Sequence, residues 1–466
     1  MANLYSRLPS TDEVLDLLGK ASVLENMPRP EAKKLVNDFL DGIRAKIREG
    51  GITEADELAL DRLEPHIRAY VNEKSKPHFR RVLNATGVVI HTNLGRSNLA
   101  EEAIEAVVEA CHDYSNLEFD LETGKRGTRY SHVEELLCRI TGAESALMVN
   151  NNAAAVFLTL NTLAMGKEVI VSRGELVEIG GSFRIPDVMA RSGSALKEIG
   201  ATNRTHLKDY EDAISENTGA LMKVHASNFR IIGFTKEVSA RELRPLADKH
   251  GLPLIEDLGS GNFFNFAEYG MGWEPTVQET VASGIDVVTF SGDKVLGGPQ
   301  AGVIVGRKKY VDRIKKNPIN RAMRIDKMTL AAMESTLRLY LDPELARESI
   351  PTLAMITAGP DELKKRAARL KRLLARELGE SIKLKIIPDV SRVGGGSFPE
   401  RDLKTYLVAV MPVDGISPDE LKNRLLGTDP PLVGRIEDDM FCLDPRTLRD
   451  DAFKLVANSL KQAIKN

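Results

Sequence analysis

The middle of the chain consists of short apolar runs separated by segments with helical periodicity. The runs are SALMV (145–149), EVIVS (168–172), ALMKV (220–224), LPLIED (252–257), DVVTF (286–290) and GVIVG (302–306). Strands that alternate with helices form mostly parallel sheets covered by helices on both faces. We therefore expect an α/β fold between about residues 82 and 306.

The flanking segments have different patterns. Three amphipathic helices are expected before the linker at 72–78: one capped by Ser10, one ending at Gly50-Gly51, and one starting at Thr53. After about residue 360 the order is helix, strand, glycine-rich turn, strand, helix, strand and helix. The predicted domains are an N-terminal helical domain (1–75), a large catalytic domain (76–340) and a small C-terminal α+β domain (341–466).

Composition narrows the class of protein. The 466 residues hold 64 Lys plus Arg against 67 Asp plus Glu, a net charge of −3. Any nucleic-acid contact must therefore come from a local basic patch. The three cysteines have no metal-type spacing and cannot all pair, which is typical of a reducing compartment. With no apolar signal segment and no 18-residue apolar run, we expect a cytoplasmic protein.

The segment 286–306 carries the clearest chemical signal. An apolar strand ends at Phe290, and Ser291, Gly292, Asp293 and Lys294 follow before two glycines and a second strand. A lysine in such a turn is placed to reach a cofactor aldehyde. It forms an imine if desolvation or a neighbouring cation lowers its pKa, because only the neutral amine is nucleophilic. Ser291 is placed to bind a phosphate. A surface lysine is the alternative, and the Ser-x-x-Lys spacing of acyl-serine enzymes lacks its partner motifs here.

A second signal is Asp257, which ends an apolar strand 37 residues before Lys294. Pyridoxal phosphate (PLP) stores electrons only while its ring nitrogen stays protonated, and a neighbouring carboxylate maintains that state. The spacing is typical of aspartate-aminotransferase-like, fold type I PLP enzymes. A strand-end aspartate alone is more often a cap or loop residue.

The third signal is VNNNAAAV (149–156), where a strand runs into an Asn-rich turn and a helix. Backbone N–H groups at a helix N-terminus bind phosphate, and small residues allow its close approach. The candidates for this phosphate cradle are Asn150, Asn151, Asn152 and Ala153, although an ordinary Asn N-cap explains the pattern equally well. His225, also after a strand, is a candidate to stack on a cofactor ring or a buried structural histidine.

Six motifs in the expected order resemble those of the bacterial selenocysteine synthase family. They are NATGVVIHTNLGRSNL (84–99), NLEFDLETGKRGTRYSHVEELL (116–137), RGELVEIGGSFRIPDVM (173–189), EDLGSG (256–261), SGDKVLGGPQAG (291–302) and NRAMRIDKMTL (320–330). The resemblance covers essentially the whole chain. It implies an aspartate-aminotransferase-like PLP-dependent transferase fold and a homodecamer built from dimers.

The resemblance also implies a reaction and roles for named residues. The family converts L-seryl-tRNA(Sec) to L-selenocysteinyl-tRNA(Sec) with selenophosphate, losing water through an aminoacrylyl-tRNA intermediate before selenium adds. Lys294 would hold PLP, Asp257 would face its ring nitrogen, and Asp293 would assist Lys294. The arginines expected to bind the anionic donor are Arg96, Arg321 and Arg324.

Recognition of tRNA is implied by the resemblance alone. Residues 1–75 are expected to grip the tRNA, although their basic side chains are explained equally well by solubility. The basic run from Arg307 to Arg324 has the same two explanations, an RNA-facing surface or a solvated helix face. The alternative function is a PLP-dependent lyase acting on a small amino acid or amino sugar phosphate, which would not need the N-terminal helices.

Overall fold

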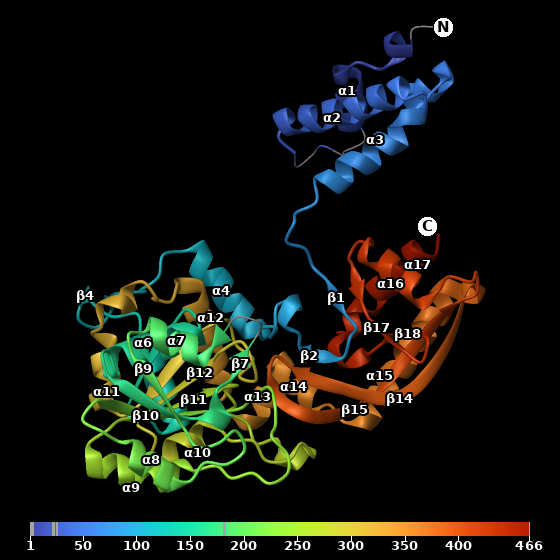
Figure 1. The fold of residues 1–466 in the computed structure, drawn as a ribbon. Helices are drawn as coiled ribbons and strands as arrows, with labels where there is room; N and C mark the ends of the chain where they lie inside the picture. Colours follow the sequence, from blue (N-terminus) through green and yellow to red (C-terminus); the bar gives the residue numbers. More distant parts are fainter. Residues whose placement is uncertain (1–3, 21–23, 25–26, 180–182, 466) are drawn as a thin grey trace. The chain divides into compact units, whose positions relative to one another are not determined.

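The computed structural model describes residues 4–20, 24, 27–179 and 183–465. The chain divides into two compact units, residues 1–81 and 82–466 (Figure 1). No helix in the described part of the chain is long and apolar enough to cross a membrane.

The first unit is a small helical bundle. Its helices are α1 (Thr11–Lys20), α2 (Arg29–Arg48) and α3 (Leu60–Lys74). They share a core in which Leu18, Leu40 and Ile67 are fully buried. The predicted cap at Ser10 is confirmed, since Ser10 N–H and Oγ–H both donate to the Glu13 carboxylate at 2.8 Å.

The third helix starts later than predicted. The expected start was Thr53, but residues Ala55–Leu58 form a separate 3-10 turn and α3 begins at Leu60. The cause is Ala59, whose backbone is extended and therefore interrupts the helix.

The second unit contains a seven-stranded sheet, and its order confirms the predicted mostly parallel α/β arrangement. In spatial order the strands are β5 (Ser145–Val149), β13 (Gly302–Gly306), β12 (Val287–Ser291), β11 (Leu254–Gly259), β10 (Thr218–Val224), β6 (Glu168–Ser172) and β9 (Ala195–Ile199). All neighbouring pairs are parallel except those of β13, which runs antiparallel to β5 and β12.

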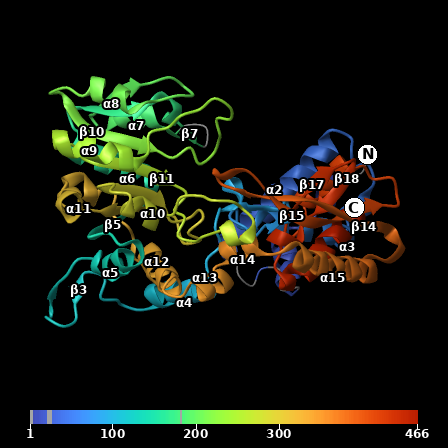
Figure 2. The ribbon, with the colours of Figure 1, turned by 90° about the horizontal axis from the view of Figure 1, so that it is seen from below.

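Helices cover both faces of this sheet (Figure 2). Side chains along each strand alternate between two separate cores; in β5, for example, Leu147 belongs to one and Met148 to the other. One core is closed by α6 (Asn152–Leu163), α7 (Ile185–Arg191) and α11 (Lys308–Lys315). The other is closed by α5 (Ser131–Thr141), α8 (Leu207–Ala213), α9 (Ala240–His250), α10 (Val277–Ala282) and α12 (Lys327–Leu339).

A five-stranded sheet lies in the C-terminal part of the unit. Its order is β17 (Arg435–Glu437), β18 (Met440–Leu443), β15 (Ser397–Pro412), β14 (Ile382–Gly394) and β2 (Val88–Ile90). It packs with α15 (Pro360–Leu378), α16 (Pro418–Leu426) and α17 (Phe453–Lys465) around a third core. The remaining elements are β1 (Leu83–Asn84), β16 (Leu432–Val433), α4 (Glu101–His112), β3 (Phe119–Asp120), β4 (Lys125–Arg126), β7 (Glu178–Ile179), β8 (Phe183–Arg184), α13 (Pro343–Ser349) and α14 (Pro351–Thr357).

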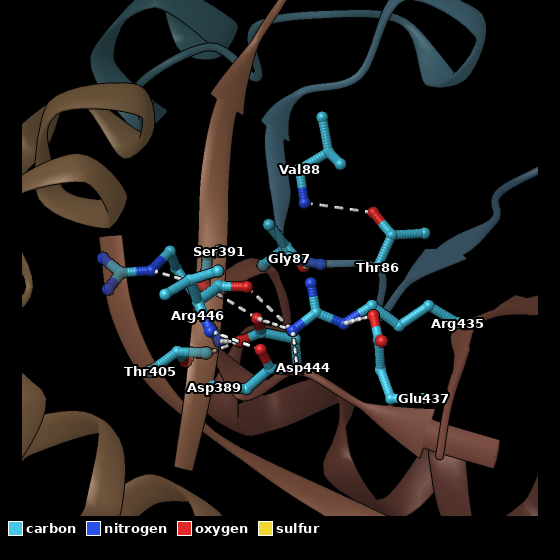
Figure 3. A network of polar contacts seen from close by, with 12 residues as sticks. Thr86, Gly87, Val88, Asp389, Ser391, Thr405, Arg435, Glu437, Asp444 and Arg446 are labelled. Atoms are coloured by element: carbon cyan, nitrogen blue, oxygen red, sulfur yellow. Dashed lines mark hydrogen bonds and ion pairs between the residues drawn. The ribbon is translucent and has the colours of Figure 1, made fainter. Parts of the chain in front are cut away.

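A buried polar network lies beside the residues that lead into strand β2 of this sheet (Figure 3). The fully buried Asp444 carboxylate accepts hydrogen bonds from Ser391 Oγ at 2.7 Å and Thr405 Oγ1 at 3.0 Å. The buried Arg446 donates from Nε to Ser391 Oγ at 2.9 Å. Gly87 has φ +76°, and a Cβ there would lie 2.1 Å from Asp444 Oδ2, so only glycine fits. The network therefore packs closely against Gly87, which lies near the start of the segment that leads to Arg96.

Candidate functional site

Lys294 is a buried amine at the sheet edge. It lies in the turn between β12 and β13 and is only 5% exposed. The turn is held by Ser97, whose Oγ is 2.7 Å from the carbonyl oxygens of both Asp293 and Lys294. Burial lowers the pKa of Lys294, and the Arg96 cation lowers it further, against the opposing effect of two carboxylates. A larger fraction of Lys294 is therefore neutral and nucleophilic than for an exposed lysine.

Asp257 lies on the neighbouring strand. Strand β11 is parallel to β12, so the polar ends of both strands meet at one edge of the sheet. Asp257 is 2% exposed and accepts hydrogen bonds from Asn152 Nδ2 at 2.8 Å and Thr289 Oγ1 at 3.0 Å. Burial raises the pKa of Asp257, while these hydrogen bonds and the Lys294 cation act in the opposite direction. The structure thus brings together the two residues that the sequence singled out.

The Asn-rich turn joins β5 to α6. Asn151 caps the helix by accepting the Ala154 N–H at 2.9 Å, and Asn150 N–H donates to the Met323 carbonyl at 3.0 Å. The Asn152 side chain is bonded to Asp257 rather than standing free for an anion. The part of the predicted cradle that remains suited to a phosphate is the backbone at the start of α6, including Ala153. The first N–H groups of a helix have no intrahelical partner and can therefore bind an anion.

His225 and Ser291 border the same edge. His225 follows β10, and its backbone N–H donates to the Asp257 carbonyl at 2.9 Å. Its Nε2 is 3.4 Å from Glu274 Oε1. Burial, reinforced by Lys223 and Arg230, lowers the pKa of His225 to about 4, so the imidazole is neutral near neutral pH. Ser291 ends β12 and is 5% exposed.

The site has unused hydrogen-bonding capacity that suits a polar aromatic cofactor. Four buried atoms in it have no hydrogen-bond partner among the described residues: Asn152 Oδ1, His225 Nδ1, Ser227 Oγ and Ser260 Oγ. Buried polar atoms are normally paired, and an orphan requires an explanation. A phosphorylated pyridine with a hydroxyl and an aldehyde offers the donors and acceptors that such atoms need, so these residues fit PLP.

The three predicted anion-binding arginines occupy different surroundings. Arg96 has a left-handed backbone (φ 64°) and donates from Nη1 to Asp293 Oδ2 at 2.7 Å. Both line a cavity of about 440 Å³ beside the Lys294 turn. Arg324 pairs with Glu118 at 3.0 Å, and its backbone bridges Val149 at the end of β5. Arg321 is exposed to solvent.

Three residues that the sequence analysis did not single out also belong here: Ser97, Thr289 and Glu118. Ser97 and Glu118 lie within motifs noted in the sequence, but nothing in the sequence pairs them with Lys294 or Arg324. Thr289 had a usable signal, since it is a polar residue inside the apolar run DVVTF. Its partner Asp257 is 32 residues away in the sequence.

The lowered pKa of His225 predicts a pH dependence of stability. An unfolded histidine binds a proton near pH 6.5, whereas folded His225 does so only near pH 4. The free energy of unfolding should therefore fall as the pH drops through this window, by at most about 3 kcal/mol from this group. Denaturant unfolding of the cofactor-free His225→Gln variant should show a flatter dependence than the wild type. The exposed His250→Gln should keep the wild-type slope, and equal slopes for all three would contradict the prediction.

Comparison with known proteins identifies related family models in both the N-terminal part and the rest of the chain. The family model described as L-seryl-tRNA selenium transferase matches residues 82–449, and the model described as selenocysteine synthase N terminal matches residues 5–44. The L-seryl-tRNA(Sec) selenium transferase of Maridesulfovibrio salexigens is 63% identical over 464 residues, covering 100% of both chains. That of Desulfomicrobium baculatum is 61% identical, also over 100% of both.

Among solved structures, D-glucosaminate-6-phosphate ammonia-lyase aligns with a TM-score of 0.54 at 21% identity. The alignment covers 83% of this chain and 96% of the lyase, and it shows a shared fold. The full-length relatives and the family model, which matches most of the chain, go further: the chain belongs to the L-seryl-tRNA selenium transferase family.

Proposed function

We propose that this chain converts L-seryl-tRNA(Sec) to L-selenocysteinyl-tRNA(Sec), with PLP held by Lys294 and selenophosphate as the selenium donor. The observation that carries the proposal is the pairing of a buried Lys294 with a buried Asp257 at one sheet edge, in a chain whose full-length relatives have this activity in their names. The alternative, a small-molecule lyase on the same scaffold, has only the shared fold in its favour.

PLP, when bound, supplies an electron sink that makes the α-proton of the seryl group acidic and its β-hydroxyl a leaving group. Lys294 Nζ would hold the cofactor through its aldehyde, and its free amine would be the group that moves the α-proton. Asp257 would keep the ring nitrogen protonated. Its carboxylate is held in one orientation by hydrogen bonds from Asn152 and Thr289. Asp293, fixed by Arg96, orients Lys294.

The other predicted residues bind and orient. The backbone N–H groups at the start of α6, those of Asn152 and Ala153, and the Ser291 hydroxyl would bind the cofactor phosphate. The neutral His225 would pack against the cofactor ring, since an uncharged imidazole needs no counter-ion in a buried site. Arg96, Arg321 and Arg324 bind the anionic donor, for which the planar fork of arginine is well suited.

The chain is further proposed to act as a homo-oligomer of dimers, a decamer by family resemblance. In support, the second unit has a groove of about 760 Å³ between α4, α12 and the segment 113–121. Its exposed apolar side chains include Tyr114, Phe119 and Leu121. Exposed apolar patches of this kind mark interaction surfaces. Sedimentation of the full chain measures the assembly, and a monomer at assay concentration would contradict it.

The experiment that tests the function compares the full chain with a variant lacking residues 1–75. Formation of selenocysteinyl-tRNA(Sec) from seryl-tRNA(Sec) and selenophosphate is followed, together with the visible absorbance of bound PLP. The N-terminal unit is proposed to grip the tRNA, so its loss should lower kcat/KM for seryl-tRNA by at least about 10-fold. Because residues 82–466 form a compact unit with its own cores, the truncated chain should keep the absorbance.

Two other outcomes are informative. A full chain that binds PLP but leaves seryl-tRNA unchanged would remove the selenium function and favour the lyase. A truncated chain with full activity would keep the chemistry and remove the role of the N-terminal unit.

A further inference from the structure

Glu118 is surrounded by arginines. Its Oε1 accepts hydrogen bonds from Arg129 Nη2 at 2.6 Å, Arg129 Nε at 3.0 Å and Arg324 Nη1 at 3.0 Å. Its Oε2 accepts a longer one from Arg126 Nη2 at 3.2 Å. The Arg129 interaction, followed by the charges of all three arginines, lowers the pKa of Glu118, so the carboxylate remains ionised.

Arg129 is the fixed part of this cluster. Its side chain is 9% exposed, against 79% for Arg126, so the Arg129 pair is the one shielded from water. Arg129 Nη1 also donates to the Ile325 carbonyl, next to Arg324. The adjacent Tyr130 donates from its hydroxyl to Asn320 Oδ1 at 3.2 Å. The loop that carries Arg129 therefore holds the segment 320–325 at both ends.

The segment 320–325 in turn lies against the Asn-rich turn. The Met323 carbonyl accepts the Asn150 N–H at 3.0 Å, and the Arg324 backbone bridges Val149. The positions of both the backbone and the side chain of Arg324 are therefore set. Its backbone lies beside the turn proposed to bind the cofactor phosphate, and its guanidinium lies at Glu118.

One hydrogen bond to Glu118 leaves most of the guanidinium available. Arginine has five N–H donors in a planar fork, and among the described residues the Arg324 guanidinium donates to Glu118 from Nη1 alone. A long side chain fixed in advance loses less conformational freedom when a ligand binds. The carboxylate also offsets the repulsion between Arg129 and Arg324, which otherwise place two cations around one point.

We infer that Glu118, anchored by Arg129, is a positioning residue that presents the guanidinium of Arg324 to the anionic selenium donor. This inference rests on the proposed function, which assigns Arg324 to the donor. Glu118 touches neither donor nor cofactor in this scheme and acts only through Arg324.

The test is a double-mutant cycle on the full chain with PLP, seryl-tRNA(Sec) and selenophosphate, using Glu118→Ala, Arg324→Ala and the double variant. Loss of one charge-assisted hydrogen bond should raise the KM for selenophosphate by about 10-fold in Glu118→Ala. The PLP absorbance and the KM for seryl-tRNA should stay at wild-type values, since a positioning role concerns the donor alone. In the Arg324→Ala background, Glu118→Ala should change the donor KM by less than about 2-fold.

The conservative and control variants separate positioning from folding. Glu118→Gln keeps one acceptor oxygen at the same distance, so its donor KM should lie between those of the wild type and Glu118→Ala. Glu122→Ala removes an exposed glutamate from the same hairpin and should leave all constants unchanged. If Glu118→Ala fails to bind PLP, the cycle is completed with Glu118→Gln.

The outcomes distinguish this inference from the proposal beneath it. If Arg324→Ala leaves the donor KM unchanged, the assignment of Arg324 to the donor fails, and the inference with it. If Arg324→Ala raises the donor KM but the Glu118 substitutions do not, or if the two effects multiply independently, the positioning role is overturned while the donor site stands.

Discussion

Replacing Lys294 by alanine is expected to lower selenocysteinyl-tRNA formation by at least about 10³-fold, the usual cost of removing an enzyme nucleophile. The physical reason is that Lys294 is a buried amine beside the ends of β11 and β12, and burial lowers its pKa. The variant should also lose the visible absorbance of lysine-bound PLP. Both are measured on purified protein, by single-turnover assay and by an absorbance scan.

The matched control for this experiment is Lys461→Ala, which removes an exposed lysine from α17. It should retain wild-type turnover and absorbance. Near-normal turnover in Lys294→Ala would remove Lys294 from the chemistry and require another amine to hold the cofactor.

Replacing Asp257 by asparagine should lower turnover by about 10²- to 10³-fold, in the range found when a preorganised electrostatic partner is removed. The substitution conserves shape, so the packing of β11 should persist. It removes the charge proposed to keep the cofactor nitrogen protonated, while the asparagine Oδ1 remains as the acceptor for Asn152 Nδ2. The expected signature is retained PLP absorbance with a large fall in kcat.

Asp414→Asn serves as the control, since Asp414 is an exposed aspartate that follows strand β15. Wild-type kcat is expected there. If Asp257→Asn turned over normally, Asp257 would be a structural residue that only ties Asn152 and Thr289 together.

Some features of the candidate site follow from sequence patterns and others do not. The placement of Lys294 and Asp257 close together was predictable, because each lies at or just after the end of an apolar run in the sequence and parallel strands bring their carboxyl ends to one edge. The partner of the Asn152 side chain was not predictable, because that side chain could cap the helix, bind a phosphate or donate to a neighbouring side chain. The tertiary structure decides this, because it places the Asn152 Nδ2 donor 2.8 Å from Asp257 Oδ1.

The helix boundaries show the same limit. The start of α1 followed from a local signal, Ser10 with Glu13 three residues on. The late start of α3 did not, because it depends on the extended backbone at Ala59, and alanine is the residue that favours a helix most strongly.

By itself, the sequence determined the alternation of strands and helices, the positions of Lys294 and Asp257 after apolar runs, and the family motifs. These depend on periodicity and on short spacings, which are local properties of the chain. Tertiary structure alone decided that Glu118 and Arg129 hold Arg324, and that Gly87 lies against Asp444. Those partners are more than 190 residues apart, and such contacts arise from the packing of whole elements, which no local pattern encodes.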